Sequence, residues 1–194
     1  MVRGGQGLAR VAVVVRAAAG PWWWCGVFAA GVGVLPPGVT GRRIGVLAGA
    51  ALFIVAAAVV AYARRGRYVA LARGAARAGR HDVLQDRAVT VRNWRRGNRW
   101  WLLLALTIGI AASFAVPAAP GMLIAGCGAG LRWKAAWLGR RERGEGELLW
   151  VRVDWLGRYG GAPAGKSVKG YRGTGIAAGD AAPGGSRRRT TAGV

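Results

Sequence analysis

One segment of the sequence matches the phosphate-binding pattern G-x-x-x-x-G-K-[ST], through Gly160, Gly165, Lys166 and Ser167. Such a loop binds phosphate because its backbone amides converge at the N-terminus of a helix that follows a buried strand. Residues 149–155 alternate apolar and polar side chains, which predicts the strand. The helix is not predicted, because glycines follow at once, at Gly170, Gly173 and Gly175. We therefore expect neither a nucleotide site nor any other cofactor.

The acid–base candidates are equally sparse. His81 is the only histidine, and it stands beside Asp82, which shares a helix face with Asp86. Arginines flank both carboxylates, so capping and ion pairing are the predicted roles rather than general acid–base catalysis. The sequence thus predicts that the protein is not an enzyme.

Cysteine chemistry is not predicted either. Cys25 and Cys127 are the only two cysteines, and both lie in apolar runs. Two cysteines cannot form a disulfide framework, and no other residues complete a zinc site. We expect both to be small apolar packing residues, and we expect no metal ion.

Positive charge dominates the composition. The 194 residues contain 29 Lys and Arg against 7 Asp and Glu, a net charge of +22. A chain this basic is expected to have anionic partners, such as lipid headgroups, nucleic acid or an acidic protein. Residues 64–99 hold the densest cluster, set between two apolar runs, and short Arg-rich loops stay on the cytoplasmic side of a membrane.

Within this basic segment the spacing predicts two short amphipathic helices on the membrane surface. Arg73, Arg77 and Arg80 fall on one helix face, and a second helix is predicted over residues 83–96. The candidate contacts to anionic lipid or nucleic acid are Arg73, Arg77, Arg80, Arg92, Arg95 and Arg96. A solvated charged loop without helices is the alternative.

The apolar runs predict an all-α integral membrane protein with about four transmembrane helices in two hairpins. Residues 17–35 and 44–63 are each long enough to cross a bilayer. Residues 100–131 are too long for one span, and Pro117 and Pro120 divide them. The predicted segments are a cytoplasmic N-terminus (1–16), a first hairpin (17–63), the basic loop (64–99), a second hairpin (100–138) and a largely disordered basic tail (139–194). A shallow re-entrant second hairpin is the alternative.

The tryptophans and glycines also fit the prediction of a membrane protein. Tryptophans near the ends of the apolar runs are predicted interface anchors: Trp22, Trp23, Trp24, Trp94, Trp100, Trp101, Trp133 and Trp137. Glycine pairs four residues apart are predicted helix-packing positions: Gly45 with Gly49, and Gly126 with Gly130. An even number of spans keeps both termini and the basic loop in the cytoplasm, which places the protein in the plasma membrane.

These features favour a non-enzymatic accessory or scaffold component whose basic cytoplasmic face binds anionic lipid and a protein partner or a second copy. One alternative is a membrane-anchored nucleic-acid-handling component of a DNA-transfer or secretion machine, in which Trp94 would stack on bases. Another is a small oligomeric transporter. Transport usually requires polar groups within the spans. Thr107 and Ser113 are the main ones, and we expect their hydroxyls to bond to the helix backbone.

Overall fold

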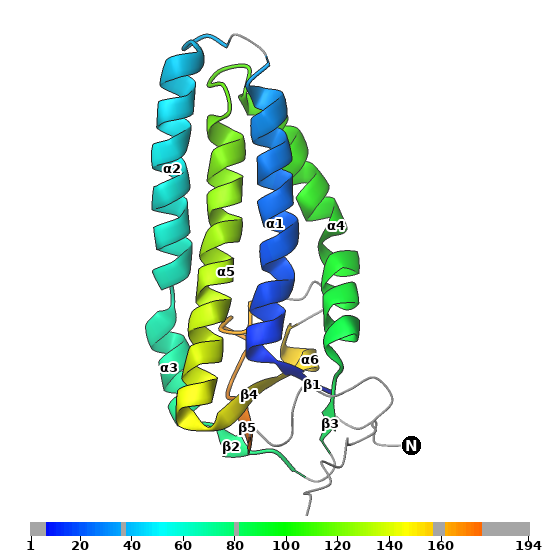
Figure 1. The fold of residues 1–194 in the computed structure, drawn as a ribbon. Coiled ribbons are helices and arrows are strands. Elements are labelled where there is room, and N and C mark those ends of the chain that lie inside the picture. Colours follow the sequence, from blue (N-terminus) through cyan, green and yellow to red (C-terminus); the bar gives the residue numbers. More distant parts are fainter. Residues whose placement is uncertain (1–6, 36–37, 80–81, 157–161, 176–194) are drawn as a thin grey trace, which may run out of the picture.

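The computed structural model describes residues 7–35, 38–79, 82–156 and 162–175. Four long helices run side by side (Figure 1): α1 (Val11–Gly33), α2 (Arg42–Tyr62), α4 (Arg87–Ala112) and α5 (Ala119–Glu145). Two short helices accompany them, α3 (Arg65–Arg73) and α6 (Val153–Leu156). Five strands gather at one end of the helices: β1 (Gly7–Arg10), β2 (Ala76–Arg77), β3 (Val83–Leu84), β4 (Glu147–Arg152) and β5 (Arg172–Gly175).

Two helical segments are long and apolar enough to cross a membrane, Val11–Gly33 and Arg42–Arg73. The second joins α2 to α3, and only 17% of its most apolar window is buried inside the protein. That exposure distinguishes α2 from the central helix of a soluble core. Among the described helices, α4 and α5 do not meet the same hydropathy criterion, because each also carries a basic half. Four transmembrane helices are therefore not established by composition alone.

The long helices approach each other through glycines, with α5 between α1 and α2 (Figure 1). A side chain on Gly26 of α1 would overlap the backbone of Ala125, and one on Gly121 of α5 would overlap the backbone of Ala30. Contact this close replaces side-chain volume with backbone-to-backbone packing, which is common between helices in membranes.

The glycines singled out in the sequence lie at the neighbouring α2–α5 contact. A Cβ atom on Gly45 would stand 2.6 Å from the carbonyl oxygen of Pro117, and one on Gly49 would stand 2.7 Å from the sulfur of Met122. Gly126 and Gly130 of α5 meet the backbone of α2 in the same way. Gly49, Gly126 and Gly130 thus contact another helix of the same chain, and Gly45 contacts the turn that precedes α5.

The tips of the two hairpins meet at the end of the bundle far from the sheet. The amide of Ala118 donates a hydrogen bond to the carbonyl of Gly33 (3.1 Å), and the hydroxyl of Thr40 donates one to the carbonyl of Ala115 (3.2 Å). The turn between α4 and α5 falls at Pro117, as predicted. The hydroxyls of Thr107 and Ser113 bond to backbone carbonyls of α4, also as predicted.

The five strands form one sheet in the order β2-β5-β4-β1-β3. The central pairs β1–β4 and β4–β5 are antiparallel, and the edge pairs β1–β3 and β2–β5 are parallel. Side chains of β4 alternate between two apolar clusters. Leu149 and Val151 pack under the helices with Tyr171, whereas Leu148 and Trp150 pack on the other face with Leu8. Burial raises the pKa of the Tyr171 phenol, which donates to the carbonyl of Pro163 at 3.0 Å.

The prediction of an all-α protein is therefore wrong. The sheet collects strands from before α1, from between the hairpins and from after α5, and four of the five have four residues or fewer, too few for a clear alternation of side chains. The predicted strand in residues 149–155 is confirmed in part, since β4 covers Glu147–Arg152. The tail is not disordered throughout, because α5 continues to Glu145 and β4, α6 and β5 follow. Residues 157–161 and 176–194 lie outside the described part.

The two helices predicted in the basic segment have the wrong bounds. Helix α3 ends at Arg73, and Arg77 belongs to strand β2. Residues 76–78 and 83–85 instead make backbone hydrogen bonds toward β5 and β1, such as the amide of Gln85 to the carbonyl of Leu8 (2.8 Å). Helix α4 begins at Arg87 and runs unbroken through Gly97 and Asn98, where an end was expected. Likewise α1 begins at Val11 and carries both Arg16 and Pro21 inside it, rather than starting near residue 17.

Candidate anion-binding site at the base of the helical bundle

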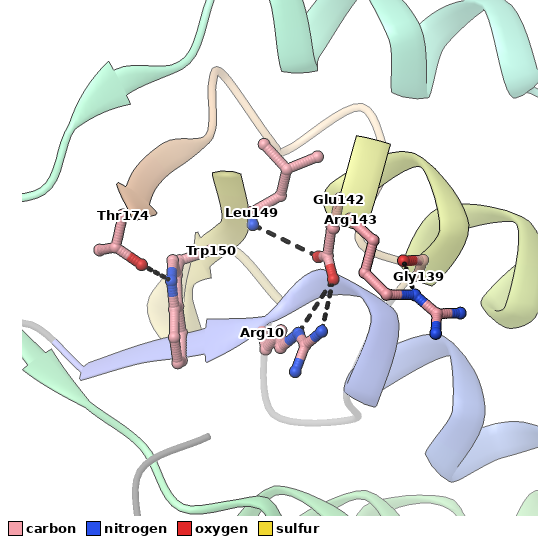
Figure 2. A network of polar contacts seen from close by, with 7 residues as sticks. All are labelled: Arg10, Gly139, Glu142, Arg143, Leu149, Trp150 and Thr174. Atoms are coloured by element: carbon pink, nitrogen blue, oxygen red, sulfur yellow. Dashed lines mark hydrogen bonds and ion pairs between the residues drawn. The ribbon is translucent and has the colours of Figure 1, made fainter. Parts of the chain in front are cut away.

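A buried carboxylate fixes the base of the bundle (Figure 2). Glu142, in the last turn of α5, has a fully buried side chain. It accepts hydrogen bonds from Nε and Nη2 of Arg10 at 3.0 and 2.7 Å, and from the backbone amide of Leu149 at 3.3 Å. A carboxylate is disfavoured at a helix C-terminus, so the guanidinium of Arg10 is needed to neutralise it. This network holds β1, α5 and β4 together.

Next to this network lies a hollow of ≈ 520 Å³, here named the arginine hollow. Six arginines from four elements line it: Arg10 of β1, Arg16 of α1, Arg87 of α4, and Arg132, Arg140 and Arg143 of α5. Its remaining described lining is small and apolar, and none of the described residues that line it is acidic. Guanidinium groups bind phosphate and carboxylate oxygens through paired hydrogen bonds. The hollow can therefore hold an anion that bears several oxygens.

Two of these arginines are held in place by neighbouring groups. Arg10 bonds to Glu142, as described above. Arg143 donates from Nε to the carbonyl of Gly139 at 3.2 Å (Figure 2). The Arg143 contact uses only Nε, so it orients this side chain while its Nη atoms keep the capacity to donate to an anion.

The structure does not gather the six arginines that the sequence singled out. Arg73 and Arg77 are exposed on α3 and β2, and Arg80 lies outside the described residues. Arg92, Arg95 and Arg96 line a different and more open hollow along α4, together with Asp86 and Arg87. Arg87 is the one arginine that lines both hollows among the described residues.

Sequence reasoning missed the arginine hollow, although one signal for it was present. Arg132, Arg140 and Arg143 are spaced by eight and three residues, which places them on one side of a helix. That spacing is informative only if residues 119–145 form one continuous helix. Arg10 and Arg16 come from more than a hundred residues away, and no local pattern connects them to α5.

The predicted interface tryptophans separate into three groups. Trp24, Trp100, Trp101 and Trp133 are exposed. Trp22 and Trp23 lie near the middle of α1 rather than at its end, and the Trp23 ring packs edge-on against Phe53 at 6.1 Å. Trp137 lies under the guanidinium of Arg65, 4.9 Å from it.

Trp94 differs from the rest because it is buried, with 7% of its surface exposed. It lines a pocket inside the bundle with residues of α1 and α5. In this position it neither anchors the protein at a lipid interface nor presents a ring for base stacking.

The segment that resembles a phosphate-binding loop has a different structure. Gly160 lies outside the described residues, and the Ser167 hydroxyl donates to the carbonyl of Trp155 at 2.8 Å. Lys166 is exposed, and the chain after Val168 leads into strand β5 rather than into a helix. Comparison with protein-family models, curated proteins and solved structures gave no match to this chain.

Proposed function

We propose that this chain is a multipass membrane protein in which α1, α2, α4 and α5 all cross the bilayer, and whose basic end binds anionic lipid. The observation that carries this proposal is a belt of large apolar side chains on the outside of the bundle. Its exposed members include Phe28 on α1, Leu47, Ile54 and Val59 on α2, Leu103 and Ile108 on α4, and Leu123 on α5. Exposed apolar surface on every long helix suits a hydrocarbon solvent rather than water.

The meeting of the hairpin tips supports full crossing by the second hairpin. If α1 and α2 cross, then Ala115 and Ala118, which bond to Thr40 and Gly33, reach the same far side. The apolar part of α4, residues 100–112, spans only about 20 Å at 1.5 Å per residue. Arg99 and Arg132 border this zone, and side chains of this length can extend to the headgroups while the bilayer thins locally.

The basic end of the bundle is the basis for the proposed orientation in the membrane and for the proposed lipid-binding role. Strands β1 to β5 all lie at this end (Figure 1), and it carries the arginine hollow. Positive charge favours the cytoplasmic side. The protein then acts as a non-enzymatic scaffold that holds anionic lipid at its base and presents the sheet to a partner in the cytoplasm.

Labelling of single cysteines should show this topology. In a background without Cys25 and Cys127, an impermeant maleimide applied to sealed cells should label Val39→Cys and Phe114→Cys. It should label Ala76→Cys and Lys166→Cys only after the membrane is opened. All four positions are exposed in the structure. Labelling of Lys166→Cys together with Val39→Cys would contradict an even number of crossings, and a Phe114→Cys that reacts from neither side would indicate a re-entrant hairpin.

Lipid retention should test the arginine hollow. The triple variant Arg16→Gln, Arg132→Gln, Arg140→Gln should lose preference for phosphatidylglycerol over phosphatidylcholine, measured as lipid retained per protein after purification from mixed micelles. Each arginine near an anionic surface contributes about 1 kcal/mol, so the loss should total about 3 kcal/mol at low salt.

The control is the variant Arg42→Gln, Arg43→Gln. It removes two exposed charges at the start of α2, at the end of the bundle far from the arginine hollow. If the control loses as much preference for phosphatidylglycerol as the triple variant, the arginine hollow does not bind anionic lipid specifically. If the unmodified protein instead retains single-stranded DNA in preference to phosphatidylglycerol at the same salt, the nucleic-acid alternative should replace lipid binding.

A further inference from the structure

A second pocket, of ≈ 500 Å³, lies where α1, the α2–α3 junction, α4 and α5 come together. We name it the lysine pocket after Lys134 of α5, which lines it beside Arg64, Tyr68 and Asn98. Ala162 and Pro163 contribute to its wall. It shares no lining residue with the arginine hollow among the described residues.

The unusual feature of this pocket is the burial of its lysine. Only 6% of the surface of Lys134 is exposed, yet no hydrogen bond or ion pair of this residue occurs in the described part of the chain. Its Nζ atom lies 5.8 Å from the centre of the Tyr68 ring, which is a weak cation–π contact. Holding an ammonium group in a narrow pocket without a counter-charge is unfavourable, although Nζ itself is not among the fully buried nitrogen atoms that lack a partner. The fold therefore leaves a cation in need of an anion.

Neighbouring positive charges make an unpaired ammonium group in this pocket still less favourable. Arg64 lines the same pocket and Arg65 follows it, while no acidic residue is among the described residues that line it. Arg65 is held away by its own contacts, with Nε bonded to the carbonyl of Ala61 at 3.0 Å and its guanidinium 4.0 Å from the Tyr62 ring. Repulsion within the pocket would be relieved by one bound anion.

The backbone at Arg64 gives independent support. This residue has φ 59° and ψ 13°, in the left-handed region that residues other than glycine rarely adopt. The conformation ends α2 and begins α3, so it brings an arginine to the pocket at the cost of local strain. Strained residues of this kind concentrate at ligand sites.

We propose that the lysine pocket binds one phosphate-bearing group, with Lys134 and Arg64 as its two cationic ligands. The phosphate belongs either to a lipid headgroup or to a soluble phosphate, since both present the same oxygens. This inference goes beyond surface attraction of anionic lipid, and it holds whether or not all four long helices cross a bilayer.

The test measures thermal unfolding of the full-length protein in neutral detergent, followed by tryptophan fluorescence. One arm compares inorganic phosphate with chloride at equal ionic strength. The other compares dioctanoyl phosphatidic acid with dioctanoylglycerol, which lacks the phosphate. We expect at least one phosphate probe to raise the Tm in a saturable manner. Lys134→Met should weaken that binding about tenfold to a hundredfold, as expected for the loss of a charge-assisted contact.

Two further variants make the result decisive. Lys166→Met removes an exposed lysine at the same end of the protein and should respond as the unmodified chain does. Arg64→Gly removes the second cation while relieving the left-handed backbone, so it should fold well and still bind phosphate weakly. Without any probe, Lys134→Met should have a higher Tm than the unmodified protein, because it removes a cation that Arg64 repels in the same pocket.

The two arms identify the source of the phosphate. A response to phosphatidic acid alone supports a headgroup site, and a response to inorganic phosphate alone supports a soluble ligand. If neither probe raises the Tm, or if Lys134→Met and Arg64→Gly respond to both probes as Lys166→Met does, the proposal is overturned.

Discussion

Replacing Glu142 with alanine should destabilise the protein by about 3–5 kcal/mol, the usual cost of removing one partner of a buried ion pair. The carboxylate is fully buried, and without it the guanidinium of Arg10 and the amide of Leu149 lose their acceptor. The strands β1 and β4 would then be held to α5 by apolar packing alone. Unfolding by SDS in mixed micelles, followed by tryptophan fluorescence, measures the loss.

The control for this prediction lies one turn further along α5. Glu145 pairs with Arg141 at 2.7 Å but is exposed, and exposed pairs of this kind contribute about 0.5 kcal/mol or less. Glu145→Ala should therefore be nearly neutral. In the double variant Arg10→Met, Glu142→Met, much of the lost stability should return, because neither charge stays buried alone. Equal effects of Glu142→Ala and Glu145→Ala would show that the network is not structurally important.

Replacing Gly121 with leucine should separate α1 from α5. A Cβ atom at this position would overlap the backbone of Ala30, and backbone cannot move aside as a flexible side chain can. Overpacking of a tight contact usually costs about 1–3 kcal/mol, and we expect the upper end of that range or more because a main chain is in the way. The same SDS unfolding experiment measures it.

Gly31 provides a matched comparison on α1. No atom lies within 4 Å of a Cβ built there, so Gly31→Leu should be neutral or stabilise the helix by up to about 1 kcal/mol through better helix propensity. A Gly121→Leu variant as stable as Gly31→Leu would mean that α1 and α5 do not touch as described.

The hairpins could be predicted because their signals are local. An uncharged run such as residues 44–63 can be recognised without reference to the rest of the chain, and Pro117 marks a turn wherever the neighbouring helices lie. Helix α2 and the α4–α5 turn were therefore found, although the extension of α5 to Glu145 was not.

The sheet, the arginine hollow and the lysine pocket could not be predicted, because their signals are not local. The two-residue strands Ala76–Arg77 and Val83–Leu84 become strands only because β5 and β1 offer hydrogen-bonding partners. The helical spacing of Arg73 and Arg77 was accidental, since the chain leaves the helix between them. The burial of Lys134 depends on helices and a tail segment that meet only in three dimensions.

The order of the strands has a consequence for biosynthesis. Strand β1 precedes both hairpins in the chain, whereas its antiparallel partner β4 begins only at Glu147, after both of them. At about 5–20 residues per second, roughly 7–27 s pass between synthesis of the two strands. Both hairpins emerge from the ribosome during that interval, whereas the sheet cannot close until β4 has followed them. The sheet therefore closes late, and it holds the two hairpins together only after α5 has been made.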